Sequence, residues 1–531
     1  MQNPITGAQL IGTTQSDQGQ KTFQTSNPRD GKPTPWEFRE TTKEELQKAA
    51  ELAAVAFPAF RDLPGTRRAE FLEAIAAQLE TDLEDLVEAY TLESGLPEGR
   101  ARGELGRTTG QLRAFATLAR EGSWTMARID TALPDRSPVP KPDLRKCLLP
   151  LGPIAVFGAS NFPFAFSTAG GDTASALAVG CPVVVKGHPL HAATGEAVAR
   201  CIQKAARQTG MPEGVFSHLQ SSGISLGEKL VKHPSIKGVG FTGSRKAGLA
   251  LFRLGQQRLE PIPVFAEMGS INPVVVLPSA TEESRGWAKA YAQSVTLGAG
   301  QFCTNPGLIL GMADPAWDRF VASLSEEIRQ VPAGCMLHKN MAENFRRLKT
   351  EFLSQKGVEE VASLEGADRD ALVGGTVARV SGADFCETPS LQQEVFGPFT
   401  LMVACSGREE LLRAVSMLEG QLTASVLGDT DEISSHPELL NLLKDRVGRL
   451  LFNGVPTGVE VCPSMHHGGP YPATTDARFT SVGTDAVLRW VRPVSFQNAP
   501  PELLPPALRD ENPLEILRMV DGEYTQKRIG G

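Results

Sequence analysis

Five short runs of mostly apolar, often β-branched residues, separated by helix-length segments, constrain the fold of this chain more than any other feature. The runs lie at residues 153–159, 182–187, 215–220, 236–241 and 264–269, with gaps of 15–27 residues between them. Such gaps can hold crossover helices, and near-continuous apolar runs are typical of strands buried on both faces. The pattern predicts a doubly wound parallel α/β sheet, a fold that binds ligands at the carboxyl ends of its strands.

The segment before this sheet is predicted to be helical. Thr42 and Glu45 have the spacing of a capping box, and apolar residues then recur on one helical face. A second helix is expected from the apolar positions between Phe71 and Leu86. The Pro-punctuated stretch 133–150 reads as an extended crossing segment.

A second alternating region runs from 273 to about 460, and the last 30 or so residues are Pro-rich. The alternation predicts a second α/β unit. We expect the Pro-rich end to lie along the surface of the protein.

Composition excludes several classes of protein. Of 531 residues, 41% are hydrophobic and 21% charged, which is a globular balance rather than that of a disordered chain. The net charge of −8 argues against nucleic acid or an anionic membrane as the main partner, since both attract clustered basic charge. No apolar run approaches the roughly 18 residues of a membrane span, and the first twenty residues lack the pattern of a signal peptide. The eight cysteines include no C-x-x-C pair, so we expect a reduced, cytoplasmic protein without a metal site.

Gly238, Gly240 and Gly243 match the spacing G-x-G-x-x-G, and Glu267 lies 24 residues beyond Gly243. That combination is typical of a dinucleotide-binding turn with an acidic ribose ligand. Gly238 and Gly240 fall inside an apolar run, however, so Gly243 and Ser244 are the expected turn, and Gly248 would allow the following helix to pack closely. A cofactor-binding turn and a purely structural strand exit are both open at this point.

Cys303 differs from the other cysteines in its surroundings, because Gly298, Gly300 and Gly307 flank it. Small, turn-forming neighbours leave a thiol accessible and let backbone N–H groups point at a substrate oxygen. The other seven cysteines are expected to be inert core residues. From the residues alone, Cys303 is either a nucleophile or another buried thiol.

Three polar residues sit at or just beyond the ends of predicted strands. Glu267 at the end of a buried strand would have a raised pKa and suit a general base, or it could cap a helix or pair with an arginine. The amide of Asn161 could donate to an oxyanion, or simply stabilise a turn. Lys186 could meet a ribose or phosphate, or be a solvated strand end. Together with Cys303, these are the parts for oxidising an aldehyde through a thioester.

Seven segments resemble, in order, motifs of the aldehyde dehydrogenase superfamily, and they cover nearly the whole chain. They are GPIAVFGASNFPFAF (152–166), PVVVKGHP (182–189), GFTGSRKAG (240–248), EMGSINP (267–273), GQFCTNPG (300–307), EVFGPF (394–399) and LFNGVPTGV (451–459).

The resemblance implies Cys303 as nucleophile, Glu267 as general base and Asn161 as oxyanion donor. It implies an NAD(P) cofactor, with Lys186 at the adenosine ribose, Gly243 and Ser244 at the dinucleotide and Glu394 at the nicotinamide ribose. The remaining residues expected at the cofactor are His188, Gly248 and Phe396.

The resemblance also implies a domain division. Residues 1–136 and 151–267 would form the dinucleotide-binding domain and residues 268–483 the catalytic domain. Residues 137–150 and 484–498 would form an arm that assembles a homodimer or homotetramer. The remaining residues, 499–531, are expected to be a surface tail.

One departure from the family pattern bears on the cofactor. Members that prefer NAD often carry Glu three residues after the lysine, where this chain has Pro189. A carboxylate there would bond the ribose hydroxyls and repel a 2′-phosphate. Its absence, with Lys186 and His188 nearby, favours NADP, with NAD still possible. Two further departures are Ser160, in place of a common Trp, and Ser270-Ile271 in the loop after Glu267.

Residues 465–483 and the Pro-rich tail resemble one bacterial branch of the family. That branch oxidises 2,5-dioxopentanoate (α-ketoglutaric semialdehyde) and is related more distantly to an NADP-linked long-chain aldehyde dehydrogenase. His466 or His467 could tune the thiolate of Cys303, since a neighbouring imidazolium stabilises it, or could simply hold a loop. A substrate carboxylate would need an Arg or Lys in its tunnel.

Three other functions stay open from the sequence. The aldehyde could be long-chain or varied, CoA rather than water could take the acyl group, or the scaffold could be a non-catalytic binding protein. Glu267 favours hydrolysis over transfer to CoA. The presence of a suitable residue type at every reactive position favours an enzyme.

Overall fold

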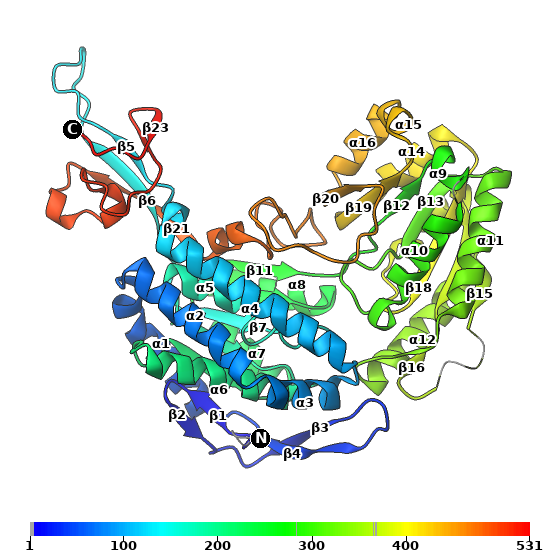
Figure 1. Cartoon of the computed structure of the whole chain (residues 1–531), viewed down its shortest axis with the longest axis horizontal. Coiled ribbons are helices and arrows are strands. Elements are labelled where there is room, and N and C mark those ends of the chain that lie inside the picture. Colours follow the sequence, from blue (N-terminus) through cyan, green and yellow to red (C-terminus); the bar gives the residue numbers. More distant parts are fainter. Residues whose placement is uncertain (1–4, 283, 365, 367–368, 531) are drawn as a thin grey trace.

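The computed structural model of the protein describes residues 5–282, 284–364, 366 and 369–530. Within these residues two seven-stranded sheets form two lobes, and a five-stranded sheet projects from the first lobe (Figure 1). The expected parallel α/β architecture is confirmed.

The first sheet contains the five predicted parallel strands, at the predicted places, in the order β11-β10-β7-β8-β9. The chain start adds two antiparallel strands beyond β9. The strands are β7 (Ile154–Phe157), β8 (Val183–Lys186), β9 (Phe216–Leu219), β10 (Gly238–Thr242), β11 (Val264–Glu267), β1 (Gln9–Ile11) and β2 (Thr14–Ser16). Thr242 pairs with Glu267, so β10 and β11 end at the same edge of the sheet.

The predicted capping box is confirmed at the start of α1 (Lys43–Arg61). The single helix expected over Phe71 to Leu86 is wrong, because Asp82 adopts a non-helical backbone that separates α2 (Gly65–Thr81) from α3 (Leu83–Ser94). A further long helix, α4 (Glu98–Glu121), packs along α2.

The crossovers between the parallel strands hold the helices that the gap lengths predicted. They are α5 (Gly171–Val179), α6 (Ala192–Gln208), α7 (Ser225–Lys232) and α8 (Arg245–Gln256).

The second sheet has the order β15-β17-β18-β13-β12-β19-β20 and is parallel except for β15. Its strands are β12 (Val274–Val276), β13 (Leu308–Met312), β15 (Glu359–Ser363), β17 (Thr376–Ser381), β18 (Phe399–Cys405), β19 (Gln421–Leu427) and β20 (Val447–Phe452). The larger helices around it are α10 (Ser284–Thr296), α11 (Pro315–Gln330), α12 (Lys339–Leu353), α14 (Arg408–Ser416) and α16 (Pro437–Lys444). The alternating pattern after residue 273 therefore forms its own α/β unit.

The projecting sheet joins the two ends of the expected arm. Its order is β21-β6-β5-β22-β23, formed by β21 (Val491–Gln497), β6 (Leu144–Pro150), β5 (Arg128–Asp130), β22 (Arg518–Val520) and β23 (Glu523–Thr525). The tail was expected to lie along the surface, but it contributes two of these strands and a buried arginine, Arg518. Residues 484–490 also differ from the expected arm, because they form a turn of 3-10 helix that packs on α5 and buries Trp490.

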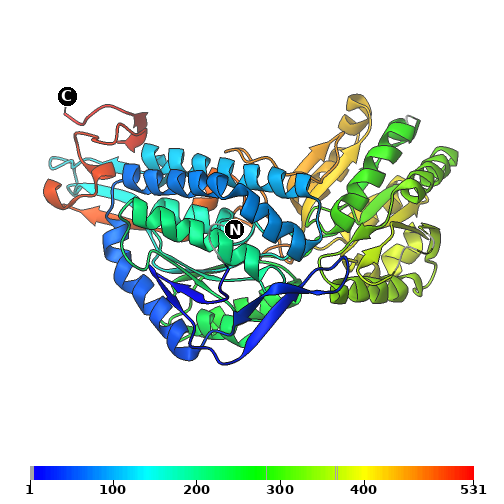
Figure 2. The same ribbon diagram turned by 60° about the horizontal axis from the view of Figure 1, so that its bottom comes forward.

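A hairpin of β3 (Thr22–Ser26) and β4 (Pro33–Arg39) runs along the lower side of the first lobe toward the second (Figures 1 and 2). Arg29 in its loop donates from Nε to the carbonyl of Gly95 at 2.7 Å. A Cβ placed on Gly95 would lie 3.3 Å from Sγ of Cys335. The hairpin loop thus lies where the two lobes meet.

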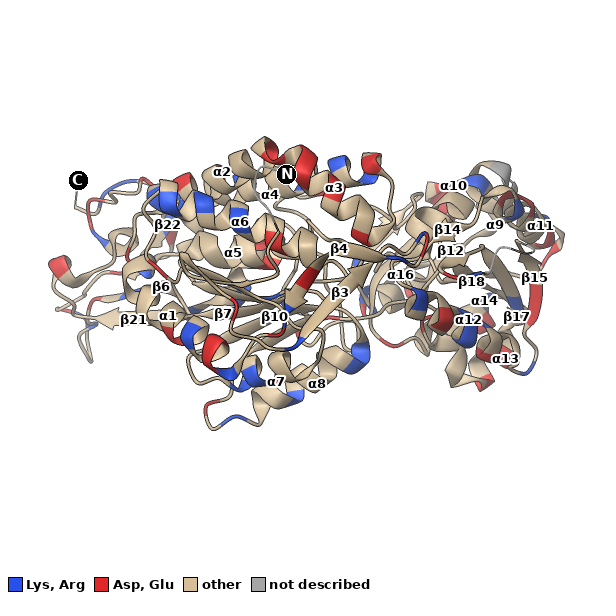
Figure 3. Ribbon diagram, turned by 90° about the horizontal axis from the view of Figure 1, so that it is seen from below, with Lys and Arg blue, Asp and Glu red and all other residues tan. Residues whose placement is uncertain are grey.

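Acidic and basic residues are interspersed along the ribbon in Figure 3, which shows no long stretch of one sign. Among the described residues, no helix is long and apolar enough to cross a membrane. Five cysteines are buried, as expected, but Cys335 and Cys462 are partly exposed, as is Cys303. The prediction that all seven others are core residues is therefore wrong for those two.

Candidate active site

The loop that carries Cys303 follows α10 and holds a backbone that few sequences can adopt. Gly298, Ala299 and Gly300 have φ of +57°, +57° and +67°. A Cβ on Gly300 would lie 2.1 Å from the carbonyl carbon of Gly397, so only glycine fits there. On the other side of the loop, Nδ2 of Asn272 donates to the carbonyl of Cys303 at 2.9 Å. Both contacts fix the position of the partly exposed thiol.

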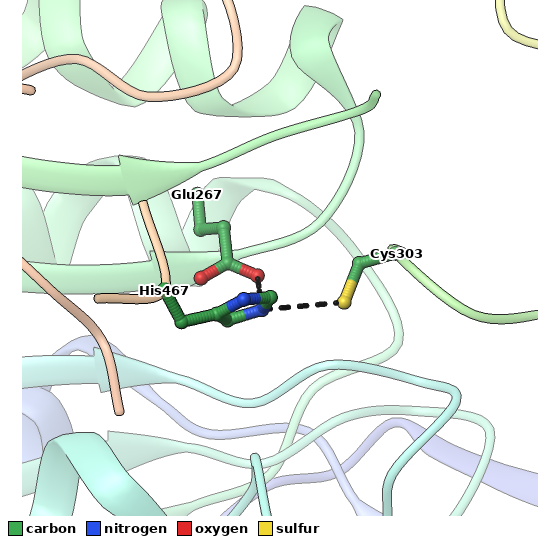
Figure 4. A group of neighbouring side chains, drawn as sticks. All are labelled: Glu267, Cys303 and His467. Atoms are coloured by element: carbon green, nitrogen blue, oxygen red, sulfur yellow. Dashed lines mark hydrogen bonds and ion pairs between the residues drawn. The ribbon is translucent and has the colours of Figure 1, made fainter. Parts of the chain in front are cut away.

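Cys303 and Glu267 meet at a third side chain, His467 (Figure 4). Nε2 of His467 lies 3.5 Å from Sγ of Cys303 and 3.0 Å from Oε1 of Glu267. The hydroxyl of Ser481 donates to the other carboxylate oxygen of Glu267, and both Glu267 and His467 are buried. The structure therefore brings together two of the predicted catalytic residues with one of the two candidate histidines.

The segment from 465 to 483 reaches this position by docking alongside β11. Met268 N donates to the carbonyl of Ala473 at 2.8 Å, and Ala266 N donates to Oγ1 of Thr475 at 3.0 Å. His467 itself is held by its own N–H, which donates to Oγ1 of Thr480 at 2.8 Å.

The ion pair decides the charges of these groups. Burial alone would raise the pKa of Glu267 and lower the pKa of His467. The opposite charges outweigh burial, because the pKa of Glu267 lies below its ordinary value and the pKa of His467 is raised to about 10. The predicted rise in the pKa of Glu267 is wrong, since the imidazolium and the Ser481 hydroxyl stabilise the carboxylate. At neutral pH the site holds a carboxylate and an imidazolium beside the thiol.

Asn161 follows β7 and is tied to the cysteine loop. Its Nδ2 donates to the carbonyl of Gln301 at 2.9 Å, two residues before Cys303. The amide carries a second N–H.

A cavity of about 330 Å³ leads to Cys303 and His467. Three phenylalanines line it, with Phe162 and Phe302 in edge contact at 5.1 Å between ring centroids. Two arginines of α4 complete its wall. Arg100 lies over Phe162 and Phe302 and pairs with Glu104 at 3.4 Å.

Arg107, the second arginine, differs from Arg100 in its partners. Nη1 donates to the carbonyl of Val459, and the guanidinium lies 5.6 Å from the ring centroid of Phe166. Its Nη2 is buried without a hydrogen-bond partner, and no ion pair within the described parts of the chain includes Arg107. Burial lowers the pKa of Arg107, and the charge of Glu104, followed by that of Cys303, opposes that shift.

The residues predicted for the cofactor lie at the carboxyl edge of the first sheet and in the second lobe. Lys186 ends β8, and its Nζ donates to the carbonyl of Ser221 at 2.9 Å. Burial lowers the pKa of Lys186 to about 8, against the attraction of Glu40. His188, which stacks on His191, has its pKa lowered, first by burial and then by His191.

The predicted turn after β10 is in place. Gly243 and Ser244 are exposed, and Ser244 caps α8 by accepting from the N–H of Ala247. Gly248 is buried, and a Cβ there would lie 2.8 Å from Met268, so it serves packing between α8 and β11.

Glu394 and Phe396 come from the loop before β18. A Cβ on Gly269 would lie 2.2 Å from Oε2 of Glu394. Glycine at 269 therefore leaves room for the Glu394 side chain close to the end of β11. Burial raises the pKa of Glu394 to about 7. Phe396 is partly exposed.

Sequence reasoning missed Ser481 and Arg107. Ser481 lies in the segment 465–483 that the sequence singled out, but nothing local indicates that its hydroxyl faces Glu267. Arg107 lies on a helix with several arginines and has no distinguishing local pattern.

The profile of the aldehyde dehydrogenase family matches residues 14–470. The chain is 46% identical over 522 residues to the "Alpha-ketoglutaric semialdehyde dehydrogenase 2" of Azospirillum brasilense, covering 98% of this chain and 99% of that protein. It is 45% identical over 526 residues to the "Alpha-ketoglutaric semialdehyde dehydrogenase" of Acinetobacter baylyi, with the same coverage.

Solved structures share the fold at lower identity. A methylmalonate-semialdehyde dehydrogenase from Oceanimonas doudoroffii superposes with a TM-score of 0.80 at 19% identity, covering 93% of this chain and 98% of that chain. A 1-pyrroline-5-carboxylate dehydrogenase from Thermus with bound NAD gives a TM-score of 0.77 at 21% identity, covering 92% of each chain.

Proposed function

Because the chain belongs to the aldehyde dehydrogenase family, we propose that it oxidises 2,5-dioxopentanoate (α-ketoglutaric semialdehyde) to 2-oxoglutarate through a thioester on Cys303. The observation that supports this most directly is the contact of the Cys303 thiol with the His467–Glu267 ion pair at the end of an aromatic cavity. The names of two relatives about 45% identical over nearly the whole chain support the choice of aldehyde.

In the first half of the reaction, Sγ of Cys303 forms a bond to the aldehyde carbon and the carbonyl electron pair moves to oxygen. The imidazolium of His467 stabilises the sulfur anion before attack. The free N–H of Asn161 and the N–H of Cys303 donate to the oxyanion. A nicotinamide cofactor held by the residues proposed below would supply the acceptor for the hydride that leaves this carbon.

In the second half, water attacks the thioester carbon and the carbon–sulfur bond breaks. Glu267, which is ionised beside His467, accepts the proton of the attacking water. The departing thiolate again faces the imidazolium of His467. Ser481 keeps the carboxylate in place through the second oxygen of Glu267.

Arg107 supports an aldehyde that carries a carboxylate. Its buried, unpartnered Nη2 would be left unsatisfied by an alkyl chain but satisfied by a carboxylate. Arg100, in contrast, is already paired with Glu104 and covered by two rings. A long-chain aldehyde is the second candidate, because the three phenylalanines of the cavity would also accept an alkyl chain.

The test is formation of reduced cofactor from 2,5-dioxopentanoate and NADP without CoA, beside Cys303→Ala. We expect turnover only with Cys303 present; a requirement for CoA would show acyl transfer instead of hydrolysis. Binding of NADP without turnover of any aldehyde would indicate a non-catalytic protein.

Arg107→Met tests the choice of aldehyde. We expect this substitution to raise KM for 2,5-dioxopentanoate by about 10–100-fold, which is the effect of losing a hydrogen bond to a charged group. KM for pentanal should change little. Arg102→Met is the control, since Arg102 lies on the same helix but pairs with Glu84 and Glu98 at the surface. Equal increases in KM for both aldehydes in Arg107→Met would contradict the recognition of a substrate carboxylate by Arg107 and favour the long-chain alternative.

The cofactor is held, in our proposal, by Lys186, His188, Gly243, Ser244, Glu394 and Phe396. The exposed N-terminus of α8 supports this proposal. It follows the Gly243–Ser244 turn, and its backbone N–H groups can bind a phosphate. Gly248 would act indirectly, by holding α8 close to β11.

We propose a preference for NADP, because Pro189 stands where a carboxylate would repel a 2′-phosphate. Glu40 interacts electrostatically with Lys186, so it is the acidic group to test. Glu40→Gln should increase the affinity for NADP relative to NAD, measured by equilibrium binding to the protein without aldehyde. A strong preference of the parent protein for NAD would contradict the proposal.

For the whole chain we propose the division implied by the resemblance, with the first lobe binding the cofactor and the second lobe contributing Cys303. The projecting sheet would join subunits into a homodimer or homotetramer. Eight unpaired cysteines support a cytoplasmic location.

A further inference from the structure

We propose that Cys303, His467 and Glu267 form a reversible binding site for Zn²⁺, and that zinc bound there blocks the thiol. A thiolate, an imidazole and a carboxylate are the three ligand types that zinc uses in proteins. One ligand atom from each lies within 4.8 Å of the others. The binding itself is independent of the proposed reaction, whereas the inhibition rests on Cys303 being its nucleophile.

Two of the three distances between ligand atoms match a tetrahedral zinc ion, and the third, between the Cys303 sulfur and a Glu267 carboxylate oxygen, is at most 4.8 Å. With zinc about 2.3 Å from sulfur and about 2.0–2.1 Å from nitrogen, tetrahedral angles place the two ligand atoms about 3.5 Å apart. Sγ of Cys303 and Nε2 of His467 are 3.5 Å apart. Nitrogen and oxygen ligands would be about 3.3 Å apart, and Nε2 of His467 is 3.0 Å from Oε1 of Glu267.

The charges also fit a divalent cation. Zinc would replace the Nε2 proton of His467, and the thiolate with the carboxylate would then neutralise its two positive charges. Three protein ligands leave a fourth position for water, as in zinc sites that stay open. Cys303 and His467 both line the cavity, so the ion has a route to the site.

The surroundings predict a transient ion rather than a resident one. Ligand histidines usually donate from the second ring nitrogen to an acceptor, which strengthens binding about 10–100-fold. Nδ1 of His467 is buried and has no hydrogen-bond partner among the residues that the structure describes. We therefore expect a dissociation constant of about 0.1–10 µM, weak enough for a chelator to reverse.

The first experiment measures Zn²⁺ binding to the parent protein by competition with a chromophoric zinc indicator, and Co²⁺ binding by its thiolate charge-transfer absorption. We expect one zinc per chain and a cobalt–thiolate band. His467→Gln and Cys303→Ser should each weaken zinc binding at least tenfold and abolish or diminish the band. Near-ultraviolet circular dichroism would confirm that both variants are folded.

Cys335→Ser and Cys462→Ser are the matched controls, because these are the other two partly exposed cysteines. Both should bind zinc as the parent does. Zinc binding that survives in His467→Gln and Cys303→Ser, or that is lost in either control, would overturn the site.

A separate readout keeps the site distinct from the proposed reaction. Zinc should slow alkylation of Cys303 by iodoacetamide, measured by mass spectrometry without aldehyde or cofactor, and a chelator should restore the rate. Alkylation that zinc does not slow would overturn the block of the thiol. Loss of turnover in Cys303→Ala, in contrast, bears only on the proposed function.

Discussion

Ser481 supports Glu267 through Oε2 and leaves Oε1 to His467. The Ser481 hydroxyl is one of the groups that lower the pKa of Glu267. A substitution at Ser481 therefore alters the ionisation of Glu267 without changing Glu267 itself. Ser481 is thus a positioning residue for the base in the proposed reaction.

Ser481→Ala should lower kcat about 10-fold or more, since a hydrogen bond to a charged group is worth about 1.5–3 kcal/mol. The pKa of Glu267 should rise, so the acid limb of the kcat profile should move to higher pH. Steady-state rates between pH 5 and pH 9 would check both effects. Ser325→Ala is the control, because Ser325 is an equally buried serine within α11. An unshifted acid limb would show that Ser481 only fills space.

His467 should govern the reactivity of the thiol. At pH 7 the imidazolium stands 3.5 Å from Sγ, and His467→Gln removes that charge while keeping a polar side chain. We expect the rate of alkylation of Cys303 to fall about tenfold or more at pH 7. His466→Gln is the control, because His466 is the neighbouring histidine and makes no contact with Sγ within the described residues. An equal rate in His467→Gln and the parent would contradict a role for the imidazolium.

The loop after α10 depends on close contact with the segment before β18. Gly300 has φ of +67° and touches the backbone of Gly397, so the two segments hold Cys303 against the second sheet.

Gly300→Ala should therefore displace the loop and lower kcat by more than 100-fold, because a misplacement of about 1 Å at the reacting atoms costs about 10²-fold. The matched control is Gly106→Ala in α4, where a Cβ would meet nothing within 4 Å. That control should be as active as the parent and, by helix propensity, more stable by about 0.5–1 kcal/mol in urea unfolding. Normal turnover in Gly300→Ala would refute the requirement for this close contact.

The elements around β8 and β9 bury two neutral histidines. Burial lowers the pKa of His191 to about 4 and that of His218 to about 3. A histidine whose pKa is lower in the folded state stabilises it fully above its unfolded pKa of about 6.5 and progressively less as the pH falls.

The free energy of unfolding should therefore fall between pH 6.5 and pH 4, by up to about 1.4 kcal/mol per pH unit for each histidine. Urea unfolding at pH 7, 6 and 5 would measure the slope. His218→Gln should reduce the slope, whereas His436→Gln, on the short segment before α16, should not. A slope that is the same in all three proteins would contradict the assignment to His218.

Across the whole molecule, the tail completes the sheet that projects from the first lobe. Arg518 is buried and donates to the carbonyls of Ala507, Arg509 and Asp510, and Asp510 also pairs with Arg145 of β6 at 2.6 Å. Asp510 in the tail therefore supports β6 at Arg145, 365 positions earlier in the chain.

Arg518→Leu should loosen this sheet, because it leaves several buried carbonyls without donors, at about 1–3 kcal/mol each. If the sheet joins subunits as proposed, the variant should dissociate at higher protein concentration than the parent, measured by sedimentation velocity. Arg528→Leu, at an exposed position, is the control. An unchanged sedimentation profile in Arg518→Leu would argue against the sheet as the subunit interface.

Local patterns in the sequence determined the elements of this protein. The apolar runs placed β7 to β11, and Thr42 with Glu45 placed the start of α1, because burial of strands and capping of helices act over a few residues. They also put Glu267, Lys186 and Asn161 at or after strand ends. The break at Asp82 and the strands of the tail were not predicted, and of these the tail strand β22 depends on pairing with the distant β5.

Only the tertiary structure decided which side chains meet. His467 reaches Cys303 across 164 residues, because the segment around 473–475 docks on β11, and no local pattern distinguishes it from His466. The same contact reverses the expected shift of the pKa of Glu267, and α4 brings Arg107 to the cavity. The physical reason is that strand and helix signals are local, whereas the charge of a buried group depends on neighbours that only folding supplies.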